Sequence, residues 1–314
     1  MALVEAQDLV KKFGSLTAVD GISFAVDRGE VVGFLGPNGA GKTTAMRIIS
    51  GFMEPTSGAA RIAGHDSHAD PIAARRRLGY LPEGAPAYAD MSVAAFLSFI
   101  AAMHGMTKAQ ANARLAELVD RVDLADVWNQ RIDSLSKGFK RRVAIAQALV
   151  HDPDALILDE PTDGLDPIQK YEMRDLIRSI APKKAIIIST HILEEVEAVC
   201  TRAIIIAAGR VLADGSPGAL EARSRHHNAV RLALAQDGID AAAALLRLPG
   251  VAAVEPVEDA EGSALMVFPR AGRSIITEVT DLVRAAGWSV VALRVERGRL
   301  DDVFRAITLP EQQA

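Results

Sequence analysis

The sequence predicts an α/β protein with a mostly parallel sheet, a helical insertion and a second, smaller α+β domain. Three patterns carry this prediction. Short, continuously apolar runs alternate with helical stretches, which is typical of buried parallel strands joined by crossover helices. Between about residues 86 and 150 the pattern is helical only. After residue 228 the order becomes strand, helix, strand, strand, helix, strand, which is the split βαβ arrangement.

The part of the sequence in which apolar runs alternate with helical stretches predicts strands that are buried on both faces. Runs of Ile, Leu and Val without polar interruption favour strands of this kind. We expect strands at 31–35, 156–158, 185–189 and 203–206, with helices at 43–50, 167–180 and 192–199.

The insertion contains three helical segments, at 93–104, 108–122 and 139–149, and no convincing strand. A polar stretch at 221–228 is typical of a linker. We therefore expect a first domain at 1–222, with its helical subdomain at about 86–150, and a second domain at 228–314.

The second domain is expected to be ferredoxin-like. The pattern predicts strands at 229–235, 252–256, 264–268 and 289–295, helices at 239–248 and 274–286, and a short closing helix near 300–307. It contains no acid pair, nucleophile with a base, or Gly-rich loop. A dimer-stabilising or regulatory role is therefore favoured over an enzymatic one, and a small-ligand sensor remains an alternative.

The charge and cysteine content of the chain indicate which partners and which compartment to expect. The 314 residues carry 35 Lys and Arg against 40 Asp and Glu, a formal charge of −5, so a broad basic surface for nucleic acid is not expected. The single cysteine, Cys200, favours a reducing compartment. No apolar segment reaches the length of a membrane-spanning helix, and the N-terminus lacks a secretory pattern, so we expect a cytoplasmic location.

A phosphate-binding loop follows the expected strand at 31–35. Residues 36–43 match G-x-x-x-x-G-K-[ST] between a strand and a helix, which is where the motif functions. The glycines allow backbone N–H groups to turn inward around an anion, and the helix N-terminus adds partial positive charge. Lys42 is expected to reach the β- and γ-phosphates and Thr43 to coordinate Mg²⁺. The loop residues expected to bind the nucleotide are Gly36, Pro37, Asn38, Gly39, Ala40, Gly41, Lys42, Thr43 and Thr44.

Two acids end the expected strand at 156–158. Asp159 at the carboxyl end of a buried strand is a candidate Mg²⁺ ligand, and Glu160 is a candidate to orient or deprotonate an attacking water. Taken alone, the pair fits equally well the end of a strand and the start of a turn at Pro161. The phosphate loop favours the catalytic interpretation.

The order of motifs resembles the ATP-binding cassette family, the ATPase subunits of membrane transporters. The resemblance covers about residues 1–220. It is carried by the phosphate loop, then the segments at 135–140 (LSKGFK), 158–162 (LDEPT), 164–166 (GLD) and 189–191 (STH).

The resemblance implies roles for further residues. Phe13 falls where the family stacks an aromatic ring on adenine; its alternative is a core aromatic on an N-terminal strand. Ser136 and Gly138 match the signature that closes on the other subunit's ATP, and Asp166 matches the loop that reaches across. His191 matches the histidine that contacts the γ-phosphate.

Two positions depart from the family pattern. The usual signature is Leu-Ser-Gly-Gly-Gln, whereas Lys137 and Phe139 stand at its third and fifth places. Glu83 occupies the usual position of a glutamine that touches Mg²⁺ and senses the water. It adds a negative charge near phosphate and the acids. Both variants resemble those of exporter-type cassettes.

The resemblance therefore implies a cytoplasmic ATPase, peripheral to the membrane, that binds MgATP, dimerises around two nucleotides and powers a separate transmembrane permease. Glu160, His191 and Lys42 are the expected catalytic residues, and Thr43, Asp159 and Glu83 the expected metal contacts. One alternative is a soluble cassette ATPase that acts on ribosomes or nucleic acid. The other is a P-loop GTPase switch, although no Asn-Lys-x-Asp segment is present. The basic runs at 75–77 and 140–142 are expected on solvated helix faces or at a partner contact.

Overall fold

The computed structural model describes residues 2–84, 87–235, 240–259 and 262–308. The chain divides into two compact units, Met1–Gly215 and Ser216–Ala314. This division lies a few residues before the expected end of the first domain at 222. Residue 86, at the expected start of the insertion, lies outside the described residues.

The centre of the first unit is a six-stranded sheet in the order β10-β9-β3-β8-β7-β6. Only the β9–β10 pair is antiparallel, so the mostly parallel sheet is confirmed. Strands β3, β7 and β8 are buried along their whole lengths, as their apolar runs require. The strands are β3 (Val31–Leu35), β6 (Leu78–Leu81), β7 (Ala155–Asp159), β8 (Ala185–Thr190), β9 (Arg202–Ala207) and β10 (Arg210–Gly215).

An antiparallel sheet that the sequence pattern did not reveal precedes and flanks the phosphate loop. Its order is β2-β1-β4-β5. The β1–β2 pairing contains several register shifts, and in β1 these break the two-residue alternation that identifies a half-buried strand, whereas β2 alternates over residues 22–27. The strands are β1 (Ala2–Phe13), β2 (Leu16–Asp27), β4 (Ser57–Ile62) and β5 (His65–Asp66).

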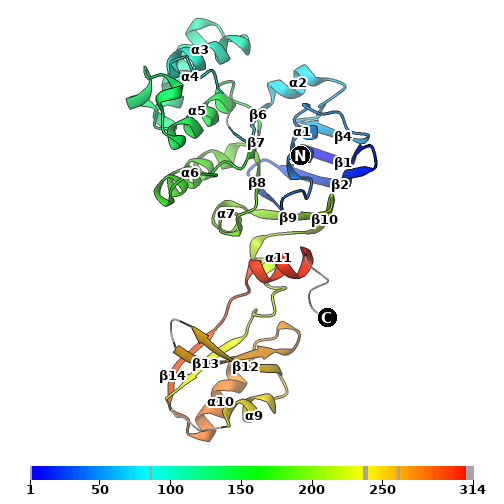
Figure 1. Cartoon of the computed structure of the whole chain (residues 1–314), viewed down its shortest axis with the longest axis vertical. Helices are drawn as coiled ribbons and strands as arrows, with labels where there is room; N and C mark the ends of the chain where they lie inside the picture. The colour runs from blue at the N-terminus through cyan, green and yellow to red at the C-terminus, as the bar shows by residue number, and fades with distance from the viewer. Residues whose placement is uncertain (1, 85–86, 236–239, 260–261, 309–314) are drawn as a thin grey trace. The chain divides into compact units, whose positions relative to one another are not determined.

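The helices of the first unit fall into two groups (Figure 1). The helical insertion comprises α3 (Val93–Met103), α4 (Lys108–Arg121) and α5 (Lys137–Leu149), close to the expected ranges. Side chains of Ser92, Thr107 and Ser136 cap these three helices, each satisfying a backbone N–H that the first turn leaves free. The other helices are α1 (Lys42–Ile49), α2 (Pro71–Arg76), α6 (Pro167–Ile180) and α7 (Leu193–Val199).

The second unit is a four-stranded antiparallel sheet with helices. The order β12-β13-β11-β14 places the third strand between the first two, as a split βαβ fold requires. The elements are β11 (Val230–Leu234), α9 (Ala241–Leu246), β12 (Val251–Asp259), β13 (Gly262–Pro269), α10 (Ile276–Ala286), β14 (Val290–Val295) and α11 (Leu300–Thr308). Residue 239, the expected start of α9, lies outside the described residues.

The stretch expected to be a linker belongs to the fold of the second unit. It follows α8 (Pro217–Glu221). Ser224 Oγ donates to Asp302 Oδ2 over 2.7 Å, and His226 Nδ1 lies 2.5 Å from the same oxygen. The Arg225 guanidinium lies 4.0 Å from the Phe268 ring centroid. The polar side chains of residues 224–226 therefore form contacts within the second unit, and this segment is not a free linker.

Candidate active site

The phosphate loop joins β3 to α1, and its glycines are required by close packing. Gly41 has φ of +101°, a conformation that favours glycine. A Cβ at Gly41 would lie 2.3 Å from the Ala18 carbonyl oxygen, and one at Gly36 would lie 2.5 Å from that of Ile206. The loop is therefore held between the antiparallel sheet and β9.

Lys42 is folded back over this loop. Its Nζ donates to the carbonyl oxygens of Gly36, over 2.6 Å, and Pro37, over 3.2 Å. Burial lowers the pKa of Lys42, while the nearby Glu160, Asp159 and Glu83 act in the opposite direction. The Lys42 amine is thus held by two neutral carbonyl acceptors, which an entering phosphate would replace with charged oxygens.

The carboxyl ends of β7 and β8 lie side by side and are joined through their side chains. Asp159 is paired in register with Ser189, and the Ser189 hydroxyl donates to Asp159 Oδ1. Asp159 is only 1% exposed, and its Oδ2 is buried without a hydrogen-bond partner. A buried, unpartnered carboxylate oxygen at the mouth of a phosphate loop fits a Mg²⁺ contact, because this ion takes one or two carboxylates together with substrate phosphates.

Glu160 is held in an unusual backbone conformation, with φ of +49°. Its amide donates to the Ser189 carbonyl oxygen over 3.0 Å. Its Oε1 lies 2.9 Å from His191 Nδ1, and its Oε2 is buried and unpartnered. Burial raises the pKa of Glu160, and His191 partly opposes this shift. A raised pKa makes this carboxylate a stronger base than an exposed glutamate.

One hollow of about 340 Å³ brings most of the expected nucleotide contacts together. Phe13 lies at its edge with 46% of its surface exposed, so the alternative of a core aromatic is wrong. Glu83, which follows β6, is also exposed there. The residues that line this hollow and were predicted from the sequence are Phe13, Asn38, Gly39, Ala40, Gly41, Lys42, Thr43, Thr44, Glu83 and Glu160.

Ser136, Gly138 and Asp166 line a different hollow, of about 560 Å³. Ser136 Oγ accepts from the Phe139 amide at the start of α5, and Asp166 Oδ1 accepts from the Gln169 amide at the start of α6. Among the residues described as lining this hollow, none comes from the phosphate loop. Within one chain, the two halves of the expected nucleotide site are therefore separate.

Arg141 departs from the expectation of a solvated basic run. It is only 7% exposed. Burial lowers its pKa, while Asp163, Glu160, Glu83 and Asp159 act in the opposite direction, so its charge lies within electrostatic reach of the acids. Its spacing from the buried Gly138 and Ile145 on α5 is the helical-period signal that could have identified it. The neighbouring Arg142 forms ion pairs with Asp123 and Glu172 of the same chain.

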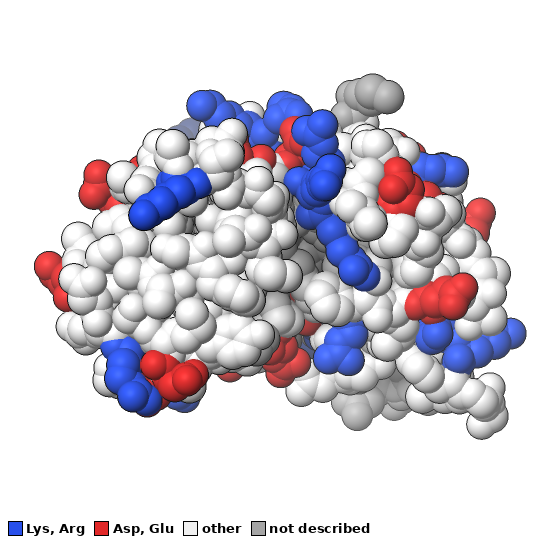
Figure 2. All heavy atoms as spheres, turned by 90° about the horizontal axis from the view of Figure 1, so that it is seen from above, with Lys and Arg blue, Asp and Glu red and all other residues white. Residues whose placement is uncertain are grey.

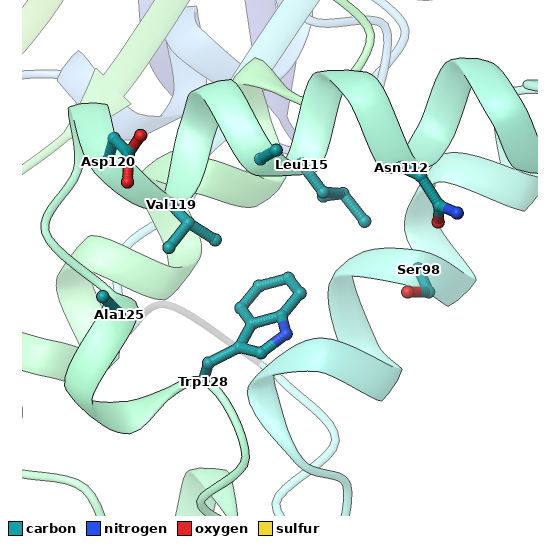
Figure 3. A pocket seen from close by; sticks show the side chains of 8 residues that line it. Ser98, Asn112, Leu115, Val119, Asp120, Ala125 and Trp128 are labelled. Carbon is teal, nitrogen blue, oxygen red and sulfur yellow. The ribbon is translucent and has the colours of Figure 1, made fainter.

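The helical insertion carries a third hollow, of about 490 Å³. Figure 3 shows the Trp128 indole facing Leu115 and Val119 of α4, with Ser98 and Asn112 farther along. Seen from above, the surface in Figure 2 has wide uncharged areas, and its basic side chains are interspersed with acidic ones. None of the helices in the described ranges is long and apolar enough to cross a bilayer.

A glycine-rich loop between a buried strand and a helix, with Asp159 ending β7 and Glu160 directly after it at the same edge of the sheet, defines a P-loop nucleoside triphosphatase. The family model described as ABC transporter matches residues 19–163. The chain is 33% identical over 308 residues to the daunorubicin/doxorubicin resistance ATP-binding protein DrrA of Streptomyces peucetius, covering 97% of this chain and 92% of that protein. The chain belongs to the ABC transporter family, as an ATP-binding subunit.

Other similarities agree with this assignment. The probable multidrug ABC transporter ATP-binding protein YbhF of Escherichia coli (strain K12) is 37% identical over 223 residues, which are 71% of this chain. The chain spans only 38% of the length of YbhF. A solved ATP-binding subunit of an ABC transporter superposes with a TM-score of 0.65 at 33% identity, covering 70% of this chain and 92% of that one.

Proposed function

We propose that this chain hydrolyses MgATP as one of two paired cassettes and thereby powers export through a separate permease at the cytoplasmic face of a membrane. The observation that carries this proposal is the division of the nucleotide site. The phosphate loop, Glu160 and Phe13 line one hollow, whereas Ser136, Gly138 and Asp166 line another. Two copies arranged head to tail would complete both sites.

The phosphate end of the nucleotide would be held by the loop. The backbone N–H groups of 36–44 and the N-terminus of α1 attract the phosphates, and Phe13 provides a surface for the base. Lys42 would exchange its two carbonyl acceptors for phosphate oxygens. Thr43, Asp159 and Glu83 would hold Mg²⁺, which supplies positive charge against the phosphates.

Glu160 and His191 would act on the attacking water. Glu160 accepts a proton from the water, and its raised pKa favours this step. His191, half exposed and 2.9 Å from Glu160, orients the carboxylate and contacts the γ-phosphate. The partner's signature residues would complete the charge stabilisation of the transferred group.

The permease would dock on the helical insertion. The hollow beneath α4 is lined by apolar side chains including Leu115, Val119 and Trp128, with polar groups at its rim. Such a combination is typical of a surface that receives a partner segment. Export is supported by the exporter-type variants at Glu83, Lys137 and Phe139, and by the drug-resistance relative that spans the second unit as well.

The variant Glu160→Gln tests the proposal. It removes the base but keeps the shape of the side chain, so we expect ATP affinity within about threefold of wild type and turnover reduced by about 100-fold or more. Size-exclusion chromatography with MgATP should show a stable dimer. Wild-type turnover in this variant would remove Glu160 from its role, and a monomer at saturating ATP would contradict the paired arrangement.

A further inference from the structure

A buried carboxylate outside the expected site links the two segments that carry Glu160 and His191. Glu195 lies in the first turn of α7 and is only 4% exposed. Its Oε1 accepts a hydrogen bond from the Thr162 hydroxyl. Its Oε2 accepts one from the Thr190 hydroxyl over 2.9 Å. The two oxygens of one side chain thus bond a residue of the loop after β7 and the last residue of β8.

The two threonines are adjacent to the proposed catalytic pair. Thr162 follows Glu160 by two residues, and Thr190 immediately precedes His191. Thr190 Oγ1 also accepts from the Ile192 amide over 3.0 Å, which fixes the backbone on the other side of His191. The Glu195 carboxylate therefore connects the loop after β7 with the carboxyl end of β8, where His191 follows.

The burial of the Glu195 carboxylate costs free energy that its hydrogen bonds offset. Burying a carboxylate is unfavourable unless hydrogen bonds compensate, and two hydroxyl donors to an ionised acceptor provide strong ones. The Glu160 backbone itself has a left-handed φ of +49°, a conformation that persists only when surrounding contacts hold it. The bonds of Glu195 are contacts of this kind.

We propose that Glu195 is a positioning residue for ATP hydrolysis. Its two hydrogen bonds fix the loop after β7 relative to the end of β8. This keeps Glu160 Oε1 and His191 Nδ1 at their separation of 2.9 Å. Glu195 is not among the described residues that line the nucleotide hollow. The inference rests on the proposed roles of Glu160 and His191, through which Glu195 acts.

The test compares variants of the full chain in steady-state ATPase assays. Because displacement of reacting groups by about 1 Å can reduce a rate about 100-fold, we expect Glu195→Ala to lower kcat by about 10- to 100-fold, with KM for ATP within about twofold. Glu195→Gln should restore most of kcat, since its amide can accept from one threonine and donate to the other. Glu194→Ala, on the exposed face of the same helix, is the matched control and should match wild type.

A double-mutant cycle separates positioning from general damage. In a His191→Ala background, adding Glu195→Ala should cost less than about twofold further, because the pair it organises is already lost. Full additivity, or wild-type kcat in Glu195→Ala, would overturn the inference. If the alanine variant unfolds, Thr162→Val and Thr190→Val each remove one of the two bonds to Glu195, and Thr190→Val also removes the bond from the Ile192 amide. Both variants should lower kcat without changing KM, and wild-type kcat in both would also overturn the inference. Wild-type turnover in Glu160→Gln and His191→Ala would instead refute the proposed function.

Discussion

Burial determines the chemistry of Cys200, which follows α7. Burial raises its pKa to about 12, and Glu195 adds to the shift. Since the thiolate is the reactive form, we expect the native protein at pH 8 to react with a chromogenic disulfide reagent about three orders of magnitude more slowly than an exposed thiol. Unfolding in urea should restore rapid reaction. Rapid labelling of the native protein would show that the thiol is not buried.

Phe13 offers an exposed ring beside the phosphate loop. The ring lies 5.3 Å from Lys11 Nζ, so it already presents a face to a cation. Base–aromatic stacking contributes about 1–3 kcal/mol, and we expect Phe13→Ala to weaken ATP binding by about 10-fold. Phe13→Trp should retain affinity. Titration with a fluorescent ATP analogue measures both, and equal affinity for the alanine variant would exclude stacking at this ring.

At the scale of elements, the end of α3 meets the end of α5 through two histidines. The rings of His104 and His151 stack at 3.8 Å, and His151 Nε2 lies 3.1 Å from the Leu78 carbonyl oxygen. Burial, with a smaller contribution from His104, lowers the pKa of His151 to about 4. Neutral His151 therefore favours the folded state. This contribution is complete above about pH 6.5 and is lost as the pH falls toward 4.

The prediction concerns the pH dependence of unfolding. Between pH 7 and pH 4.5, the free energy of unfolding of wild type should fall by about 1–3 kcal/mol more than that of His151→Gln. Urea titrations at several pH values measure the difference. His65→Gln, at a partly exposed position, serves as the control and should follow wild type. Parallel curves for wild type and His151→Gln would contradict the assignment.

Arg114 fastens α4 to the end of α5. Its guanidinium donates to the carbonyl oxygens of Leu149, over 2.9 Å, and Val150, over 3.3 Å. Carbonyls at a helix end need such partners. We expect Arg114→Ala to lower the free energy of unfolding by about 1–3 kcal/mol, measured in urea. Arg121→Ala, whose ion pair with Glu117 lies on the surface, should cost less than about 0.5 kcal/mol; equal losses would contradict the role of Arg114.

The elements also show what a sequence can predict. Strands β3, β7 and β8 were predictable because both faces are buried. The start of α6 was predicted at 167, where it lies, whereas α5 begins at Lys137, two residues before the expected 139. Strand β1 was missed because a register shift between Ala6 and Leu9 interrupts its alternation, whereas β2 alternates over residues 22–27 and was overlooked. In the site, the loop and its neighbouring acids follow from spacing and resemblance. Arg141 and Glu195 were missed because their positions depend on which helix faces turn inward, and a single charge in a sequence does not disclose this.

For the whole molecule, the separate hollows predict dependence on a second copy. Ser136→Arg in the Glu160→Gln background should leave ATP affinity of the monomer within about threefold and prevent the ATP-dependent dimer, because a bulky cation at the start of α5 obstructs the approach of the partner. Analytical ultracentrifugation with and without MgATP measures this. Ser179→Arg, exposed on α6, should still dimerise. An undiminished dimer in Ser136→Arg would place the interface elsewhere.

The location of Ser136 and Asp166 away from Lys42 has a physiological consequence. In the proposed arrangement, a solitary copy in the cell would hold a nucleotide without consuming it, since it would lack the Ser136 and Gly138 of a second copy. Surplus subunits awaiting assembly would thus cause little idle turnover of the cellular ATP pool. ATP hydrolysis would begin only when two copies pair. The rate of hydrolysis in the cell would then depend on the number of assembled transporters rather than on the amount of this polypeptide synthesised.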